Sequence, residues 1–73
     1  MVDNRWHRIE EKPKLHLTYD AYFSEHLLVK VKDSSLKGYY YMVAYLNDTD
    51  NIWFNPLIEE EIEGEVLEWK YIE

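Results

Sequence analysis

Residues 39–46 read Tyr-Tyr-Tyr-Met-Val-Ala-Tyr-Leu, and this unbroken run of apolar and aromatic residues decides the fold. Gly38 precedes it and Asn47-Asp48 follows it, and turn-forming residues at both ends favour a short strand over a helix. Side chains alternate between the two faces of a strand, so neither face is polar and both need cover. One face carries Tyr39, Tyr41, Val43 and Tyr45, and the other carries Tyr40, Met42, Ala44 and Leu46.

Several other segments have the pattern of strands. Residues 27–32 alternate between apolar and polar side chains, which is typical of a strand with one buried face. In residues 66–72 the alternation predicts that Leu67, Trp69 and Tyr71 point inward. Shorter strands are expected at residues 5–9, at residues 15–19 and from residue 52 to residue 54.

Residues 19–27 allow two interpretations. Tyr19, Tyr22, Phe23, His26 and Leu27 follow the spacing of one helix face, and Thr18 or Asp20 is a suitable N-terminal cap. The same residues are equally compatible with an irregular loop. Both alternatives stay open at this point.

The whole chain, residues 1–73, is predicted to be one small domain. A chain of 73 residues has little material for a second covering layer. We therefore expect a mainly β fold, a small antiparallel meander of about four or five strands that forms a curled sheet or a partly open barrel. A short helix near residues 19–27 would make the fold α+β.

The charge is divided unevenly along the chain. Residues 1–46 carry a net charge of +1, whereas residues 47–73 hold nine acidic residues and one base, a net charge of −8. So dense an acidic surface repels phosphate groups, which argues against direct binding to nucleic acid. The chain has no cysteine, no apolar signal core at its start and no run long enough to span a membrane. These features predict a cytoplasmic protein without a membrane partner.

A set of short motifs falls in the same order as in a known family. The motifs are Trp6, Pro13, residues 24–29, Tyr45, Trp53 and residues 66–72. In these the chain resembles small phage- and prophage-encoded proteins grouped as domain-of-unknown-function family five-five-one. It departs from them at Lys12, where the family has an apolar residue, and at Tyr71. The resemblance implies a phage-like origin, action in the cytoplasm of a host cell and a small β-rich fold, and it implies no catalytic residue.

The acidic tract of residues 59–65 is the first candidate site. If the tract is extended, Glu59, Glu61, Glu63 and Glu65 share one face. Consecutive carboxylates would then be spaced about as closely as the phosphates of one DNA strand, roughly 3.3 Å against 3.4 Å. Such a tract imitates nucleic acid and fits a basic groove. The alternative is a solvated acidic loop that keeps the protein soluble.

The aromatic residues supply the second candidate surface. Trp6, Trp53 and Trp69 are expected in the core, whereas Tyr19, Tyr22 and Tyr40 are expected in an exposed contact patch. Met42 and Leu46 share a strand face with Tyr40, so this patch would also favour self-association.

The sequence predicts neither an enzyme nor a metal or cofactor site. His7, His16 and His26 have no ligand spacing, and no nucleophile motif or phosphate loop is present. We therefore expect a protein-binding module, a phage-type inhibitor or anti-defence protein (anti-CRISPR-like or another DNA mimic) that docks on a basic, nucleic-acid-binding surface of a host protein. The alternative is a homodimeric structural module with a solubilising acidic tail. The predicted partner-binding residues are Asp48, Asp50, Glu59, Glu60, Glu61, Glu63, Glu65, Tyr40, Tyr19 and Tyr22.

Overall fold

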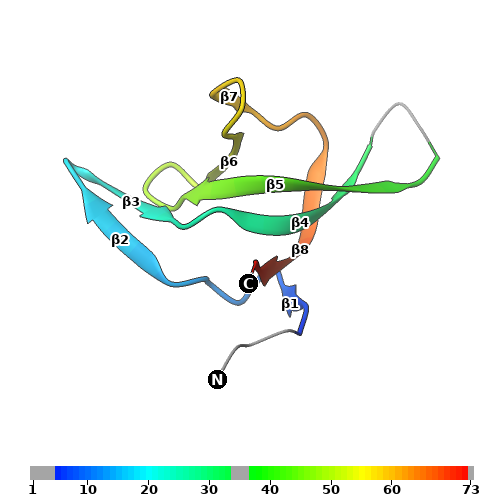
Figure 1. Cartoon of the computed structure of the whole chain (residues 1–73), viewed down its shortest axis with the longest axis horizontal. Helices are drawn as coiled ribbons and strands as arrows, with labels where there is room; N and C mark the ends of the chain where they lie inside the picture. The colour runs from blue at the N-terminus through cyan, green and yellow to red at the C-terminus, as the bar shows by residue number, and fades with distance from the viewer. Residues whose placement is uncertain (1–4, 34–36, 73) are drawn as a thin grey trace.

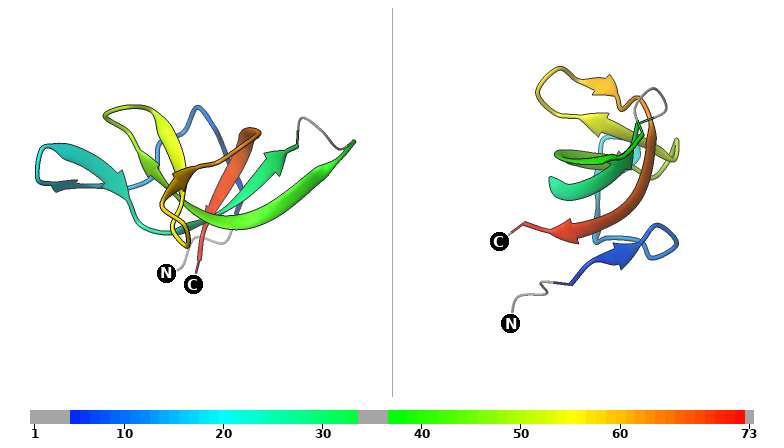
Figure 2. Two further views of the ribbon diagram at one scale, coloured as in Figure 1. Left: turned by 90° about the horizontal axis from the view of Figure 1, so that it is seen from above. Right: turned by 90° about the vertical axis from the view of Figure 1, so that its right-hand side faces the viewer.

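The computed structural model describes residues 5–33 and 37–72, and in them the chain forms an antiparallel sheet of eight strands without a helix. The sheet curls into a half-barrel (Figures 1 and 2), as the sequence predicts, but with more strands than expected. The strands are β1 (His7–Arg8), β2 (Leu15–Thr18), β3 (Ala21–Ser24), β4 (Leu27–Lys32), β5 (Tyr39–Asn47), β6 (Ile52–Asn55), β7 (Glu60–Glu61) and β8 (Glu65–Tyr71). No helix in this part of the chain is long and apolar enough to cross a membrane.

The helix considered for residues 19–27 is wrong, because this segment belongs to a β-hairpin. β2 and β3 pair with each other, and the turn between them holds Tyr19 with a φ of 58°. The hairpin is tied to the chain after β5, where the N–H of Tyr22 donates to Thr49 Oγ1 at 2.9 Å and its carbonyl accepts from the N–H of Asp48. These tertiary hydrogen bonds override the local helical spacing.

The pairing departs from a simple meander at β8. The strand order is β1-β8-β4-β5-β3-β2, so the last strand lies between the first strand and β4. β6 pairs with the opposite edge of β5 over three residues, Tyr45–Asn47, and β7 continues from β6. In Figure 1, β6 and β7 lie above β5, on the side away from β4.

The core lies on the inner face of the curl. Val29, Val31 and Leu27 of β4 are fully buried and pack with Ala44, Ile62, Val66 and Trp69. The even-numbered face of β5 points into this core, while the odd-numbered residues Tyr39, Tyr41 and Val43 are exposed on the outer face. The predicted alternation of this strand is therefore confirmed, and it also determines which face is covered.

Two predicted core positions are wrong. The register between β4 and β8 shifts at Lys30/Val31, so that Val66 takes the inward position expected for Leu67. This β-bulge changes the parity of the strand, and only Trp69 and Tyr71 keep their expected side. Trp6 lies outside the core, with its ring 5.6 Å from that of Tyr41 on the outer face.

Candidate functional site

The acidic segment, residues 59–65, is bent rather than extended. Glu59 has a φ of 54° and Gly64 a φ of 100°, and between them only Glu60 and Glu61 form a strand. The extended backbone that a straight row of carboxylates requires is therefore absent from this segment, because residues with positive φ at both ends turn the chain. The acidic side chains instead project from a bent backbone segment.

One buried side chain and several hydrogen bonds hold the backbone of the acidic segment in place. Ile62 is 9% exposed and belongs to the core, and its N–H donates to the carbonyl of Trp53 at 2.9 Å. The N–H of Glu59 donates to the carbonyl of Asn55 at 2.8 Å, and the Tyr40 hydroxyl donates to the carbonyl of Glu63 at 3.1 Å. The acidic side chains beside these anchors are exposed, so the segment presents negative charge from a fixed backbone.

Glu59 differs from its neighbours because its carboxylate has a partner. The hydroxyl of Tyr45 donates to Glu59 Oε2 at 2.6 Å. This hydrogen bond, followed by burial and by the negative charge of Glu59, raises the pKa of Tyr45 above its usual value. The Tyr45 ring also contacts the rings of Phe23, His26 and Phe54, so the carboxylate is attached to an aromatic cluster.

The other predicted site residues have different surroundings. Asp48 forms a 2.9 Å ion pair with Lys12 Nζ, and Asp50 bonds to the side chain of Asn47 within the turn after β5. Glu65 begins β8, opposite Lys32 of β4. The structure thus brings Glu60, Glu61 and Glu63 together around one hollow, whereas Asp48 is paired with Lys12 and Asp50 with Asn47.

The three candidate tyrosines are not equivalent. Tyr19 is 98% exposed at the hairpin tip, and Tyr22 is half exposed on β3, as expected. Tyr40, by contrast, is partly buried and packs against the core, so its predicted exposure is wrong. The exposed tyrosines of β5 are Tyr39 and Tyr41 on the opposite face.

Two hollows open beside the acidic segment. The first, the acidic pocket, has a volume of about 300 Å³ and is lined by Tyr40, Met42, Asn55, Ile58, Glu60, Glu61, Ile62 and Glu63. The second, the apolar pocket, has a volume of about 490 Å³ and is lined by His26, Met42, Val43, Asn55, Pro56 and Leu57. Sequence reasoning missed residues 55–58, although an exposed Leu-Ile pair after a proline was a signal for a surface contact.

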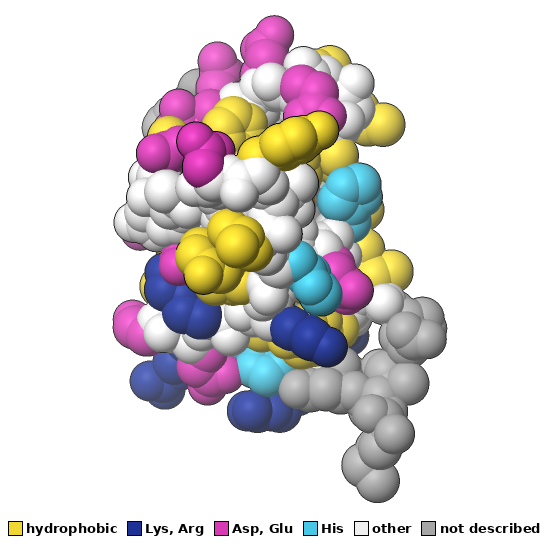
Figure 3. All heavy atoms as spheres, turned by 90° about the vertical axis from the view of Figure 1, so that its left-hand side faces the viewer, with side chains coloured by type: hydrophobic (Ala, Val, Ile, Leu, Met, Phe, Trp, Pro, Cys, Tyr) yellow, Lys and Arg dark blue, Asp and Glu magenta, His cyan; other side chains and the backbone are white. Residues whose placement is uncertain are grey.

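Acidic and basic side chains are distributed unevenly over the surface. On the face drawn in Figure 3, Asp and Glu side chains crowd the upper end, which is the β7 end of Figure 1. Lys and Arg side chains lie in the lower half of the same face. On this face the β7 end is therefore the acidic end, whereas the lower half carries side chains of both charges.

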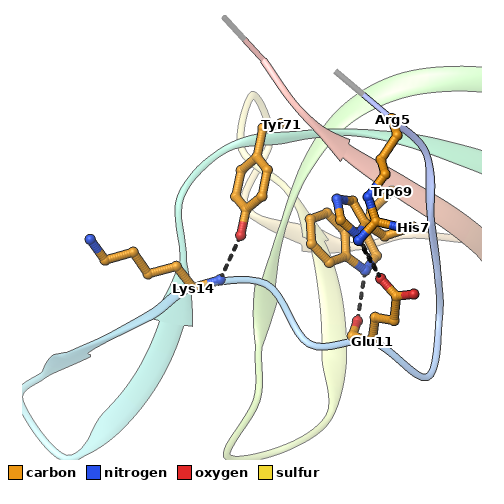
Figure 4. Close-up of polar contacts among 6 residues, drawn as sticks. All are labelled: Arg5, His7, Glu11, Lys14, Trp69 and Tyr71. Carbon is orange, nitrogen blue, oxygen red and sulfur yellow. Dashed lines mark hydrogen bonds and ion pairs between the residues drawn. The ribbon is translucent and has the colours of Figure 1, made fainter. Parts of the chain in front are cut away.

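A second polar cluster, which we call the N-terminal clasp, lies at the opposite side of the sheet (Figure 4). The buried His7 ring stacks on Trp69 at 4.2 Å, and its Nδ1 lies 2.6 Å from Glu11 Oε2. Trp69 Nε1 donates to the carbonyl of Glu11 at 2.8 Å, and the N–H of Lys14 donates to the Tyr71 hydroxyl at 3.1 Å. These contacts fasten the chain before β2 to β8, so the clasp stabilises the fold.

The chain was compared with known proteins at three levels. No family model matches it. No curated protein and no solved structure matches it either. The resemblance to the phage-encoded family therefore stays a prediction.

The described residues offer little that is typical of a catalytic or metal centre. No group of three or more His, Cys, Asp and Glu side chains is placed to hold a metal ion within residues 5–33 and 37–72. The side chains of Glu59, Glu60, Glu61, Glu63 and Glu65 are all exposed. The arrangement is better suited to electrostatic contact with another molecule.

Proposed function

We propose that this protein is a non-enzymatic binding module that docks its acidic end on a basic surface of a partner protein. The observation that carries the proposal is the anchored backbone of residues 59–63, with Ile62 in the core and exposed carboxylates on both sides of it. Because the backbone is already ordered, binding costs less conformational entropy than with a free acidic tail. Charge complementarity would speed association with a basic partner.

The partner class follows from the charge. A protein surface that binds nucleic acid is basic, and a fixed group of carboxylates competes with phosphates for it. We therefore keep the proposal of a phage-type inhibitor, an anti-CRISPR-like or other DNA-mimicking protein that acts on a nucleic-acid-handling or defence enzyme. The bent backbone favours a compact cluster of charge over an imitation of a straight DNA strand.

The proposal is tested by removing charge at the acidic end. A pull-down from bacterial lysate at low and high salt supplies the partner, which is then purified for kinetics. The triple variant Glu60→Gln, Glu61→Gln, Glu63→Gln is expected to associate about tenfold more slowly and with a flatter salt dependence. Duplex DNA should compete with the wild-type protein for the same partner.

The matched control changes the same amount of charge elsewhere. Glu10, Asp20 and Glu25 are exposed and lie outside the acidic segment, so the triple variant Glu10→Gln, Asp20→Asn, Glu25→Gln should associate nearly as fast as the wild type. Equal rates for the two triple variants would contradict docking through the acidic end.

Self-association is the second candidate, and it has its own observation. Tyr39 and Tyr41 are exposed on the outer face of β5, beside the exposed Val43. Exposed apolar surface of this kind is typical of an interface between copies. Light scattering at high concentration distinguishes the two candidates, because the docking module is expected to be monomeric without its partner.

A further inference from the structure

One edge of β5 is uncovered in the part of the chain that the structure describes. β4 pairs with β5 over residues 39–44, and β6 pairs with its opposite edge only at Tyr45–Asn47. No described strand pairs with that opposite edge over residues 39–44. Such an edge is a template for another strand.

The backbone groups of this edge point outward. The N–H of Leu46 donates to Ser24 Oγ at 2.8 Å, on the side of β5 where β3 and β4 lie. Backbone groups of alternate residues in an antiparallel strand point to alternate edges. Tyr41 and Val43 are an odd number of residues from Leu46, so their N–H and C=O groups point to the uncovered edge.

The chain after β6 turns away and leaves a trough along this edge. The Asn55 side chain accepts the N–H of Leu57 at 2.9 Å, and Pro56 has no N–H to offer β5. The acidic and apolar pockets both lie here, and they share Met42 and Asn55. The β5 residues of the acidic pocket, Tyr40 and Met42, both belong to the inner face, whereas the apolar pocket also includes Val43 of the outer face and so extends around the edge.

We propose that an extended segment of the partner protein adds to this edge of β5 beside residues 39–43. The inference rests on the proposed function, and it specifies how the basic partner is held. Main-chain hydrogen bonds to Tyr41 and Val43 would provide affinity, and pockets for alternate side chains would provide selectivity.

The two pockets specify the side chains of that segment. Side chains on its inner face enter the acidic pocket, where Glu60, Glu61 and Glu63 surround an apolar floor, and this favours Lys or Arg. Side chains on its outer face meet Val43 and Leu57, and this favours large apolar residues. Because the faces alternate with each residue, the ligand is an extended peptide that alternates basic and apolar residues.

A second copy of this chain fits the trough less well. The segment Val29 to Lys32, in which apolar and basic residues alternate, lies in β4 and is paired on both edges by β5 and β8. An added copy of β5 would bring tyrosine, methionine and valine, with no cation for the acidic pocket. Charge complementarity therefore selects a basic segment of another protein.

A synthetic peptide tests this binding mode directly. The probe is a peptide with blocked termini in which lysine and valine alternate. It has about six residues, which is the usual length of a strand. Its control carries N-methyl groups on the residues whose N–H groups would bond to β5. We expect the control to bind about tenfold more weakly for each hydrogen bond lost, measured by fluorescence anisotropy. N-methylation of the alternate residues should leave binding unchanged.

Variants of the protein complete the test. Val43→Pro removes an N–H that points away from β4, so the fold should survive while binding of the probe falls about tenfold. Leu57→Ser, at a side chain that is 91% exposed, should weaken binding without affecting stability. If Val43→Pro does not fold, the N-methylated peptides still decide the question.

The outcomes separate this inference from the proposed function. Equal binding of the methylated and unmethylated probes, or no binding of either, overturns strand addition. Loss of binding by the triple Glu→Gln variant with no effect of N-methylation leaves docking by charge intact. A stable dimer that excludes the probe would assign the edge to a second copy and overturn the inference.

Discussion

The two sides of the sheet differ in how completely other parts of the chain cover them. At the β8 side, the N-terminal clasp covers the sheet with a stacked His7–Trp69 pair and with side-chain hydrogen bonds to the chain before β2. At the β5 side, no described strand pairs with residues 39–44 on the edge that faces away from β4, and exposed Leu57 and Ile58 lie near this edge. Stability is thus concentrated at one side, and surface suited to binding at the other.

The largest expected effect comes from Trp69, at the centre of the clasp. Trp69→Ala removes a side chain that is 1% exposed, together with its stacking and its hydrogen bond to Glu11. We expect a loss of about 3–5 kcal/mol in the free energy of unfolding, measured by urea denaturation. A domain of this size has only about 4–11 kcal/mol in total, so much of its stability would disappear.

Trp6 provides the matched control for this loss. It lies on the outer face against Tyr41 and is partly exposed, so Trp6→Ala should cost only about 1 kcal/mol. If both substitutions cost the same, the two faces of the sheet would not differ as the structure shows.

Gly64 connects the acidic segment to β8, so a substitution there tests how much this connection contributes to stability. It has a φ of 100°, and a Cβ there would lie 2.6 Å from the carbonyl oxygen of Lys32. Gly64→Ala is expected to destabilise the protein by about 1–3 kcal/mol, because both the backbone conformation and the contact are unfavourable. The measurement is the urea midpoint together with amide exchange at Ile62.

A substitution at Gly38 separates the cost of the backbone conformation from the cost of the close contact. Its φ is 155°, and no atom lies within 4 Å of an added Cβ, so Gly38→Ala should cost less. Equal losses would mean that the approach of Gly64 to β4 contributes nothing.

The sequence predicted the strands whose pattern is strong and missed the features that depend on pairing. β4 and β5 were evident because residues 27–32 and 39–46 alternate or form an apolar run between turns. The hairpin at Tyr19 was hidden because the same spacing suits a helix face, and only the contacts with Asp48 and Thr49 decide it.

The candidate site was predicted in its composition but not in its shape. The concentration of acidic residues after residue 47 is a property of the sequence and survives in space. The burial of Ile62, the bulge that moves Leu67 and the uncovered edge of β5 are set by neighbours distant in the chain. No local pattern of residues 59–65 carries that information.

The smallest expected effect concerns the hydrogen bond that fixes Glu59. In the folded state the pKa of Tyr45 is raised above about 10, so folding favours the protonated hydroxyl. Its contribution to stability is therefore complete below pH of about 10 and is lost as the pH rises through the raised pKa. Tyr45→Phe should cost about 0.5–1 kcal/mol near neutral pH, and the difference from the wild type should vanish in strongly alkaline solution. A difference that persists unchanged at high pH would mean that the cost does not come from the hydrogen bond to Glu59, and the anchoring of the acidic segment would then depend on Ile62 and Tyr40.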